Sequence, residues 1–159
     1  MTPTPPADAE VLRACHYLRT VGRLPCHVAE DGLLNLPVGG DVLCLRTPED
    51  WGYQVKAQLN RDGLTAPIMW HPTKWLVILA NGPLVPDEIY PRYLESLYRT
   101  GSVLLNRGRP LILPTPGDET RGWDTPVRDH FRPGLTSVLA ALDTCYEREH
   151  RRQIGRLLR

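Results

Sequence analysis

The sequence lacks several features that would assign it at once to a known class. Its four Cys residues are scattered, with no Cys-x-x-Cys pair and no close Cys/His ladder, so we expect no metal centre and no cofactor. No apolar run approaches the roughly 18 residues of a membrane helix, and the Pro-rich start lacks the basic-then-apolar order of a signal peptide. We therefore expect a cytoplasmic protein with reduced thiols and no membrane partner.

A strong net charge and the common catalytic motifs are also missing. There are 19 basic and 18 acidic side chains, a net charge of +1, so no global field attracts nucleic acid. The sequence contains no Walker loop, dinucleotide-binding Gly fingerprint, His-Glu-x-x-His or nucleophile elbow. Positive charge is concentrated at one end, because residues 146–159 hold five Arg and two Glu. Three partners are considered for this end: an acidic protein, a nucleic-acid backbone or a second copy of the chain.

The helices are indicated by caps and by apolar spacing. Asp8 is placed to cap a helix that runs to about Val21. A second helix has a Thr47 cap, Pro48 at its first position and the acidic Asp50 three residues after the cap. A third follows residue 86, and a fourth follows residue 133 with a strong apolar face. Four helices are therefore expected.

Short apolar runs between turn residues predict the strands. These runs are residues 24–29, 33–36, 41–45, 67–70, 75–80, 102–105 and 111–113. Turn residues at 106–108 predict a hairpin between the last two runs, and residues 114–132 read as a long loop. The expected fold is one α/β (α+β) domain with a mainly antiparallel or mixed sheet flanked by helices.

The expected organisation is a flexible N-terminus (1–7), a domain (8–147) and a basic C-terminal helix extension (148–159). At 159 residues the chain is long enough to bury a real core. Residues Tyr90, Tyr93, Leu94, Leu97 and Tyr98 would form a wide apolar helix face. We expect the core to include Leu43, Leu45, Val55, Val77, Leu94, Leu97, Val103, Leu111 and Leu139.

The stretch from residue 102 to residue 123 also carries a family likeness. An apolar strand leads to Arg107-Gly108, a second apolar strand, Pro114-Thr115-Pro116 and, after a polar loop, Trp123. This order resembles the signature of bifunctional primase–polymerase domains, the archaeo-eukaryotic primase-like family. The order of elements along most of the chain is similar as well. The resemblance implies the fold of a primase–polymerase catalytic core, and it implies contacts with nucleotides or nucleic acid.

The catalytic acids of that family are missing from the matching positions. The resemblance implies two acids where this chain has Cys44 and Arg46, and a third acid where it has Leu105. Two-metal nucleotidyl transfer needs clustered carboxylates, and the guanidinium of Arg46 repels a cation. The slot of the family's phosphate-contacting His falls within 75–77 here. We therefore predict an inactive member of the family, with Asp50 acting as a helix-capping residue.

The two Trp residues beside the turn at residues 71–74 have two possible roles. Trp70 and Trp75 flank it and would either stack on a base or form a cross-strand aromatic pair that serves stability alone. His71 precedes the turn and is expected to be a turn or surface residue. We count Lys74 and Trp75 among the candidate contacts to nucleic acid.

The first functional hypothesis is a nucleic-acid-binding, nucleotide-binding or regulatory module without catalysis. Arg46, Arg107 and Arg109 would lie on the face of the lost active site and contact phosphate without metal. Together with Lys74 and Trp75 they form the predicted phosphate-binding set.

Two other hypotheses remain open. The first is a protein–protein interaction or dimerisation module that uses the C-terminal helix, with Arg148, Arg151 and Arg152 at the interface. The second is an enzyme with a reorganised site built on Cys44, His71 or the Asp118/Glu119 pair.

Overall fold

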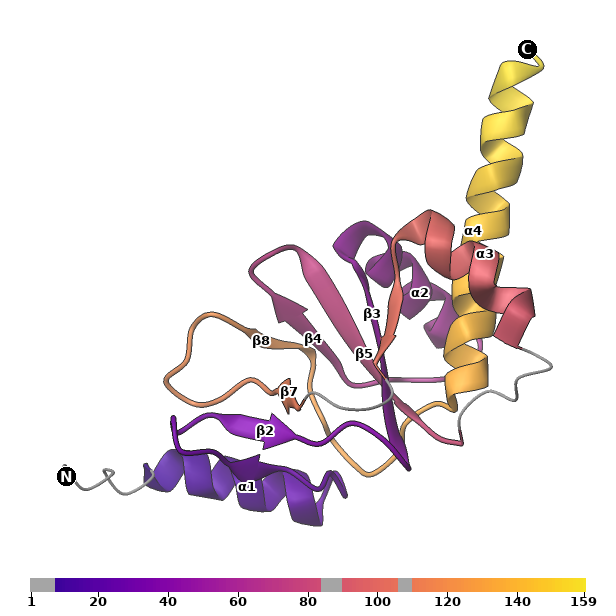
Figure 1. The fold of residues 1–159 in the computed structure, drawn as a ribbon. Helices are drawn as coiled ribbons and strands as arrows, with labels where there is room; N and C mark the ends of the chain where they lie inside the picture. Colours follow the sequence, from indigo (N-terminus) through magenta and orange to yellow (C-terminus); the bar gives the residue numbers. More distant parts are fainter. Residues whose placement is uncertain (1–7, 84–89, 106–109) are drawn as a thin grey trace.

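The computed structural model describes residues 8–83, 90–105 and 110–159. Its helices are α1 (Ala9–Thr20), α2 (Glu49–Arg61), α3 (Tyr90–Thr100) and α4 (Leu135–Leu157). Its strands are β1 (His27–Val28), β2 (Leu34–Leu36), β3 (Val42–Pro48), β4 (Ile68–His71), β5 (Trp75–Asn81), β6 (Val103–Leu105), β7 (Leu111–Ile112) and β8 (Gly122–Thr125). Figure 1 shows their arrangement.

The strands form two antiparallel sheets. The larger has five strands in the order β6-β3-β5-β4-β8, and the smaller has three in the order β1-β2-β7. The longest pairing joins β3 to β5 from Val42 opposite Asn81 to Pro48 opposite Trp75. The predicted class, one α+β domain with a mainly antiparallel sheet and flanking helices, is confirmed.

The central sheet buries a different apolar cluster on each face, because side chains alternate along a strand. On β3, Leu43 and Leu45 pack with residues of α2, α3 and α4. Val42 and Cys44 pack on the other face with residues of α1 and the small sheet. Arg46 is next in that second series and is exposed, so it marks the place where the core between the two sheets ends.

The predicted cap of α2 is wrong in its detail. The helix begins at Glu49, its N-cap is Pro48, and no side chain caps it. Thr47 belongs to β3 and is buried, and its hydroxyl accepts a hydrogen bond from the Ser102 hydroxyl at 2.8 Å. Burial of the strand therefore prevails over the local cap signal. The Asp8 cap of α1 is confirmed, because the carboxylate accepts from the Glu10 amide at 3.1 Å.

The predicted hairpin over residues 102–113 is also wrong. β6 pairs with β3 in the large sheet, whereas β7 pairs with β2 in the small one. The residues at 106–108 that suggested a tight turn lie outside the described ranges. Leu104 packs against the helix-covered cluster and Leu111 against the other. Burial on opposite sides of the large sheet thus separates two strands that are neighbours in sequence.

Some core predictions fail at the edges of the fold. Leu94 is 45% exposed and Val103 is 41% exposed, whereas Leu97 and Leu139 are buried as predicted. α3 packs on α4 through Tyr93 and Leu97, so a single neighbouring helix covers only part of its apolar face. The loop expected at 114–132 contains a strand, β8, which completes the edge of the large sheet.

α4 extends beyond the body of the domain. Its last buried side chain is Cys145, yet the helix continues to Leu157. Figure 1 shows this second half, in yellow, projecting beyond the other elements. No helix in the described ranges is long and apolar enough to cross a membrane.

Candidate functional site

A cavity of about 450 Å³ opens where the core between the two sheets ends. Its polar wall comes from β3, from β4 and the turn that follows it, from β5 and from the loop before β8. These residues are Arg46, His71, Thr73, Trp75 and Arg121. Its apolar wall consists of Met69, Val77, Leu105, Pro110, Leu111 and Ile112. The described lining thus contains two Arg side chains and no Asp or Glu.

Arg46 is held against an aromatic ring. Its guanidinium carbon lies 4.8 Å from the centre of the Trp75 ring, within the range of a cation–π contact. Among the described residues no carboxylate lies within ion-pair distance of Arg46. The positive charge is therefore oriented by Trp75 and remains free to meet an anion.

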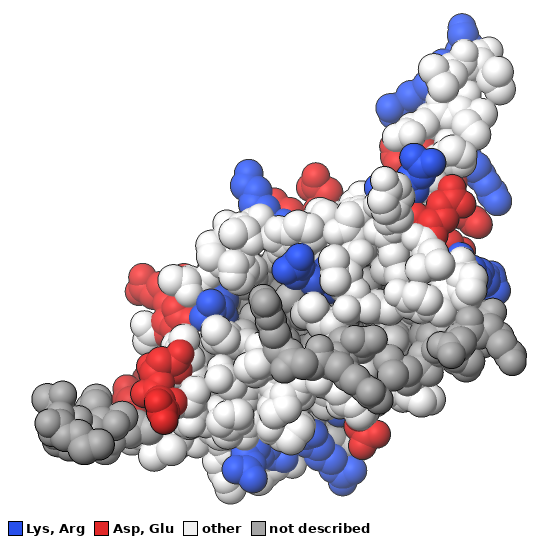
Figure 2. Space-filling model, viewed as in Figure 1, with Lys and Arg blue, Asp and Glu red and all other residues white. Residues whose placement is uncertain are grey.

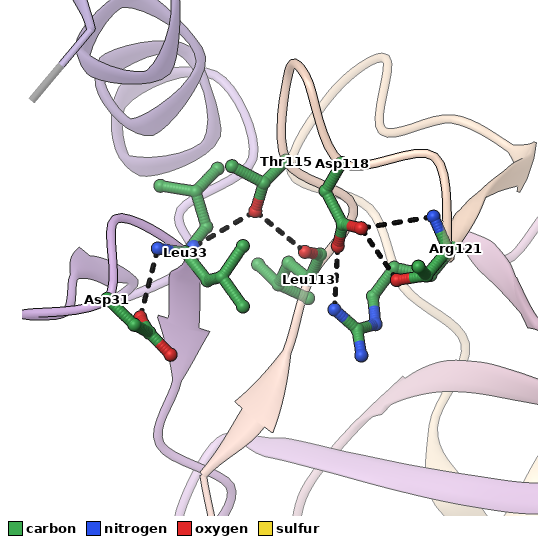
Figure 3. Close-up of polar contacts among 8 residues, drawn as sticks. Asp31, Leu33, Leu113, Thr115, Asp118 and Arg121 are labelled. Atoms are coloured by element: carbon green, nitrogen blue, oxygen red, sulfur yellow. Dashed lines mark hydrogen bonds and ion pairs between the residues drawn. The ribbon is translucent and has the colours of Figure 1, made fainter.

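Arg121 is fixed by an ion pair. Its Nη1 donates to Oδ2 of Asp118 at 2.7 Å, and both side chains are largely buried (Figure 3). Asp118 also accepts from the amide and the hydroxyl of Thr120 at 3.0 and 2.6 Å. Hydrogen bonds from Thr120, followed by the charge of Arg121, lower the pKa of Asp118. The carboxylate thus stays ionised and holds the guanidinium at the cavity wall.

The loop that carries Arg121 is tied to the small sheet by Thr115. Its hydroxyl accepts from the Leu34 amide and donates to the Leu113 carbonyl, both at 3.0 Å (Figure 3). Pro114 and Pro116 limit the backbone on either side of this anchor. The segment Pro114-Thr115-Pro116 therefore has a structural role in this chain, because it positions the loop that leads to Arg121.

His71 forms the neutral edge of the polar wall. Its Nδ1 accepts from the Thr73 amide at 3.3 Å and lies 2.7 Å from the Thr73 hydroxyl. The amide can only donate, so the ring proton belongs on Nε2. The pKa of His71 is lowered, first by desolvation and then by the charges of Arg121 and Arg46. His71 thus supplies a neutral donor, a role that the sequence reading did not give it.

The other predicted contacts divide into those at the cavity and those away from it. Trp75 lies at the cavity as the support of Arg46, and it is opposite His71 in the strand register, so it does not pair directly with Trp70. Lys74 is an exposed turn residue with φ 64° and is not among the lining residues. Arg107 and Arg109 lie outside the described ranges.

The three positions that resemble acidic slots lie together. Cys44 is opposite Leu105 across the β3–β6 pair, and Arg46 follows on the same face of β3. Burial raises the pKa of the Cys44 thiol to about 12, so it remains protonated and is a poor nucleophile. In the described part of the chain no three His, Cys, Asp or Glu side chains gather as a metal-binding group.

The predicted interface arginines lie on the second half of α4. Arg148 donates to the side-chain oxygen of Gln58 on α2 at 2.9 Å. Arg151 and Arg152 are exposed, and Arg152 lies 3.9 Å from Glu149. Figure 2 shows Lys and Arg side chains along the projecting helix, while charges of both signs are scattered over the body in the same view.

Trp123, the last residue of the family likeness, lines a different hollow. An apolar groove of about 370 Å³ lies between α1 and the loop around β8, with Tyr17 and Trp123 among its lining residues. The sequence reading also missed Thr73 and Arg121 at the main cavity. The length of the loop that holds Arg121 was the only feature of the sequence that indicated a functional role for this residue.

Comparisons of the chain with known protein families, with curated proteins and with solved structures give no match.

Proposed function

We propose that this chain is a non-catalytic, primase–polymerase-like module that binds the phosphate of a nucleotide or of a nucleic-acid strand between its two sheets. One observation carries the proposal: Arg46, oriented by Trp75, shares a cavity wall with Arg121 and His71, and the described lining holds no Asp or Glu. Guanidinium groups suit phosphate because their donors match its oxygens. The family likeness gives the same ligand class.

The shape of the cavity supports a ligand with one charged and one apolar end. Its volume of about 450 Å³ lies in the usual range for small-molecule sites. Met69 and Val77, which lie next to Arg46 in the register of the large sheet, and Ile112 of the small sheet offer an apolar surface for a base or sugar. We propose that nucleotidyl transfer is absent, because Cys44, Arg46 and Leu105 replace the acids that such chemistry requires.

The test is binding of a nucleoside triphosphate and of a labelled single-stranded oligonucleotide by the full chain at low salt. Arg46→Gln should weaken binding roughly tenfold or more, because a charge-assisted contact to phosphate contributes about 1.5–3 kcal/mol. For the oligonucleotide, the salt dependence should flatten by about 0.7 in slope for the lost contact. Arg13→Gln, an exposed change on α1 away from the cavity, is the matched control.

Equal binding by the Arg46 and Arg13 variants would remove the cavity from the proposal. Absence of binding to any nucleotide, DNA or RNA at low salt would contradict the proposed function as a whole. Binding of the triphosphate without the oligonucleotide would restrict the ligand to mononucleotides.

The projecting half of α4 supports a second candidate, a protein–protein or self-association module. Leu157 and Leu158 are 85% and 83% exposed, and Ile154 is 44% exposed beside the basic side chains. Apolar residues at this spacing on a helix are typical of a helix–helix contact. A basic surround favours an acidic partner over a second copy of the same helix.

Removal of residues 148–159 separates this candidate from a solvated helix end. The thermal midpoint should change little, since the last buried side chain of α4 is Cys145. If the extension is an interface, sedimentation should show association lost in the truncated chain and in Leu157→Ser/Leu158→Ser. Identical monomers with identical partner binding in all three proteins would exclude it.

A further inference from the structure

Two cysteines face each other at the junction of α1 and the small sheet. Cys15 lies on α1, and Cys26 directly precedes β1. Their Sγ atoms are 3.8 Å apart, and each Sγ also reaches the other residue's carbonyl oxygen, at 3.7 and 3.8 Å. Both side chains are buried, with 7% and 2% exposed. Side chains and backbones of the two segments are therefore already close.

Neighbouring apolar side chains and a backbone hydrogen bond keep the two cysteines close together. Cys15 and Cys26 belong to one apolar cluster, together with Val11 and Leu18 of α1 and Leu24 of the connecting segment. The Leu24 amide also donates to the Leu18 carbonyl at 3.0 Å, closing the turn that brings the chain back along the helix. A disulfide has an S–S distance of about 2.05 Å. The two sulfurs must therefore move about 1.8 Å closer for the bond to form.

We propose that Cys15 and Cys26 form an oxidation site, at which a peroxide converts the two thiols into a reversible disulfide that joins α1 to the strand entering the small sheet. Cys15 is the more exposed of the two and meets the oxidant first. Its sulfur takes one peroxide oxygen to give a sulfenic acid, and the other oxygen leaves as water. The Cys26 sulfur then attacks the Cys15 sulfur, and the hydroxyl leaves as a second water.

Burial sets the pace of this reaction. Desolvation, with an added contribution from the neighbouring Cys15 thiol, raises the pKa of Cys26 to about 12. Cys26 is therefore almost entirely a protonated thiol at neutral pH, and its attack on the oxidised Cys15 should be slower than attack by an exposed cysteine. Transient detachment of α1 would expose both thiols and accelerate their oxidation. Because such openings are brief, the site would respond to sustained oxidant.

The disulfide would strengthen the part of the molecule that supports two hollows. α1 lines the groove that contains Tyr17 and Trp123, and the small sheet contributes Leu111 and Ile112 to the main cavity. A cross-link between α1 and the residue before β1 lowers the conformational entropy of the unfolded chain. The oxidised protein should therefore unfold at a higher temperature than the reduced one.

The experiment treats the full chain with hydrogen peroxide under native conditions and then labels the remaining thiols with an alkylating reagent in denaturant. The reduced protein should take four labels, one for each Cys, and the oxidised protein two. Digestion after Arg and Glu separates Cys26 from Cys44, since Glu30 lies between them. A cross-linked peptide pair containing Cys15 and Cys26 is expected, and it should disappear after reduction with dithiothreitol.

Cys44 and Cys145 provide matched controls, because both are fully buried. Cys44→Ser and Cys145→Ser should leave the cross-link and the rise in the thermal midpoint intact, whereas Cys15→Ser should remove both. The wild-type labelling decides the question even if a variant folds poorly. Four labels after prolonged oxidation of the native protein, or a cross-link that mainly involves other cysteines, would overturn the proposal.

Discussion

Replacing Arg132 with Ala is expected to lower the free energy of unfolding by about 3 kcal/mol, because a buried charged donor with several hydrogen bonds is lost. Arg132 is only 8% exposed. Its Nε donates to Oδ1 of Asn81 at 2.9 Å, and its Nη1 donates to the Gly22 carbonyl at 2.7 Å. The Asn81 amide group returns a hydrogen bond to the Arg132 carbonyl at 3.1 Å.

These contacts join three elements that are distant in sequence. Gly22 follows α1, Asn81 ends β5, and Arg132 leads into α4. Urea unfolding of Arg132→Ala and Arg132→Lys measures the effect, and Lys should retain part of the stability by keeping the charge. Arg128→Ala, at an exposed site in the same loop, should change stability by less than about 0.5 kcal/mol. An Arg132→Ala protein as stable as Arg128→Ala would show that the hydrogen bonds contribute nothing.

Replacing Gly52 with Val is expected to destabilise the protein by about 2–3 kcal/mol, because it overpacks the contact between α2 and β5. A Cβ atom at Gly52 would lie 2.6 Å from Cδ1 and 2.9 Å from Cβ of Leu76. The Leu76 Cδ1 can rotate away, but its Cβ is fixed by the strand. The helix must therefore shift away from the sheet, and the shift loosens the helix-covered core.

Gly155→Val is the matched control, because it introduces the same side chain at a position where nothing is crowded. Gly155 lies in the projecting half of α4, and a Cβ there would meet nothing within 4 Å. Gly155→Val should leave the thermal midpoint nearly unchanged, whereas Gly52→Val should lower it clearly. Similar midpoints for the two variants would mean that α2 has room to move and that its close packing is not required.

Local signals predicted the elements well and their partners poorly. The Asp8 cap marks the start of α1, and the apolar spacing of residues 135–145 marks α4, since caps and periodicity depend on neighbouring residues alone. The partner of a strand depends on which faces become buried. Thr47 therefore joins the sheet instead of capping α2, and β6 and β7 join different sheets despite the turn residues between them.

The candidate site was only partly visible in the sequence for the same reason. Arg46 stood out because the family likeness puts an acid at its position, and Trp75 stood out as an aromatic beside a turn. His71 and Arg121 are 50 residues apart in sequence, and they come from the end of β4 and from the loop before β8. Their meeting depends on the β4–β8 pairing and on the Thr115 anchor, neither of which has a local sequence signal.

The most direct test of the account is the pKa of His71, measured by NMR in the free protein and with adenosine 5′-monophosphate. In the free protein the pKa should lie below the ordinary value, because desolvation and the two arginines disfavour the imidazolium. A phosphate bound beside the ring should stabilise the imidazolium and raise this pKa, so that binding strengthens as the pH falls. Sulfate, whose charge is constant in this range, separates the response of His71 from the titration of the nucleotide phosphate.

His16, exposed on α1, serves as the internal control, and its ring resonances should not change when the ligand is added. We predict that the ligand raises the pKa of His71 in the wild-type protein and that this rise is absent in Arg46→Gln. An unchanged His71 pKa at saturating ligand, or equal ligand-induced changes in the ring resonances of His71 and His16, would contradict an anion site between the two sheets.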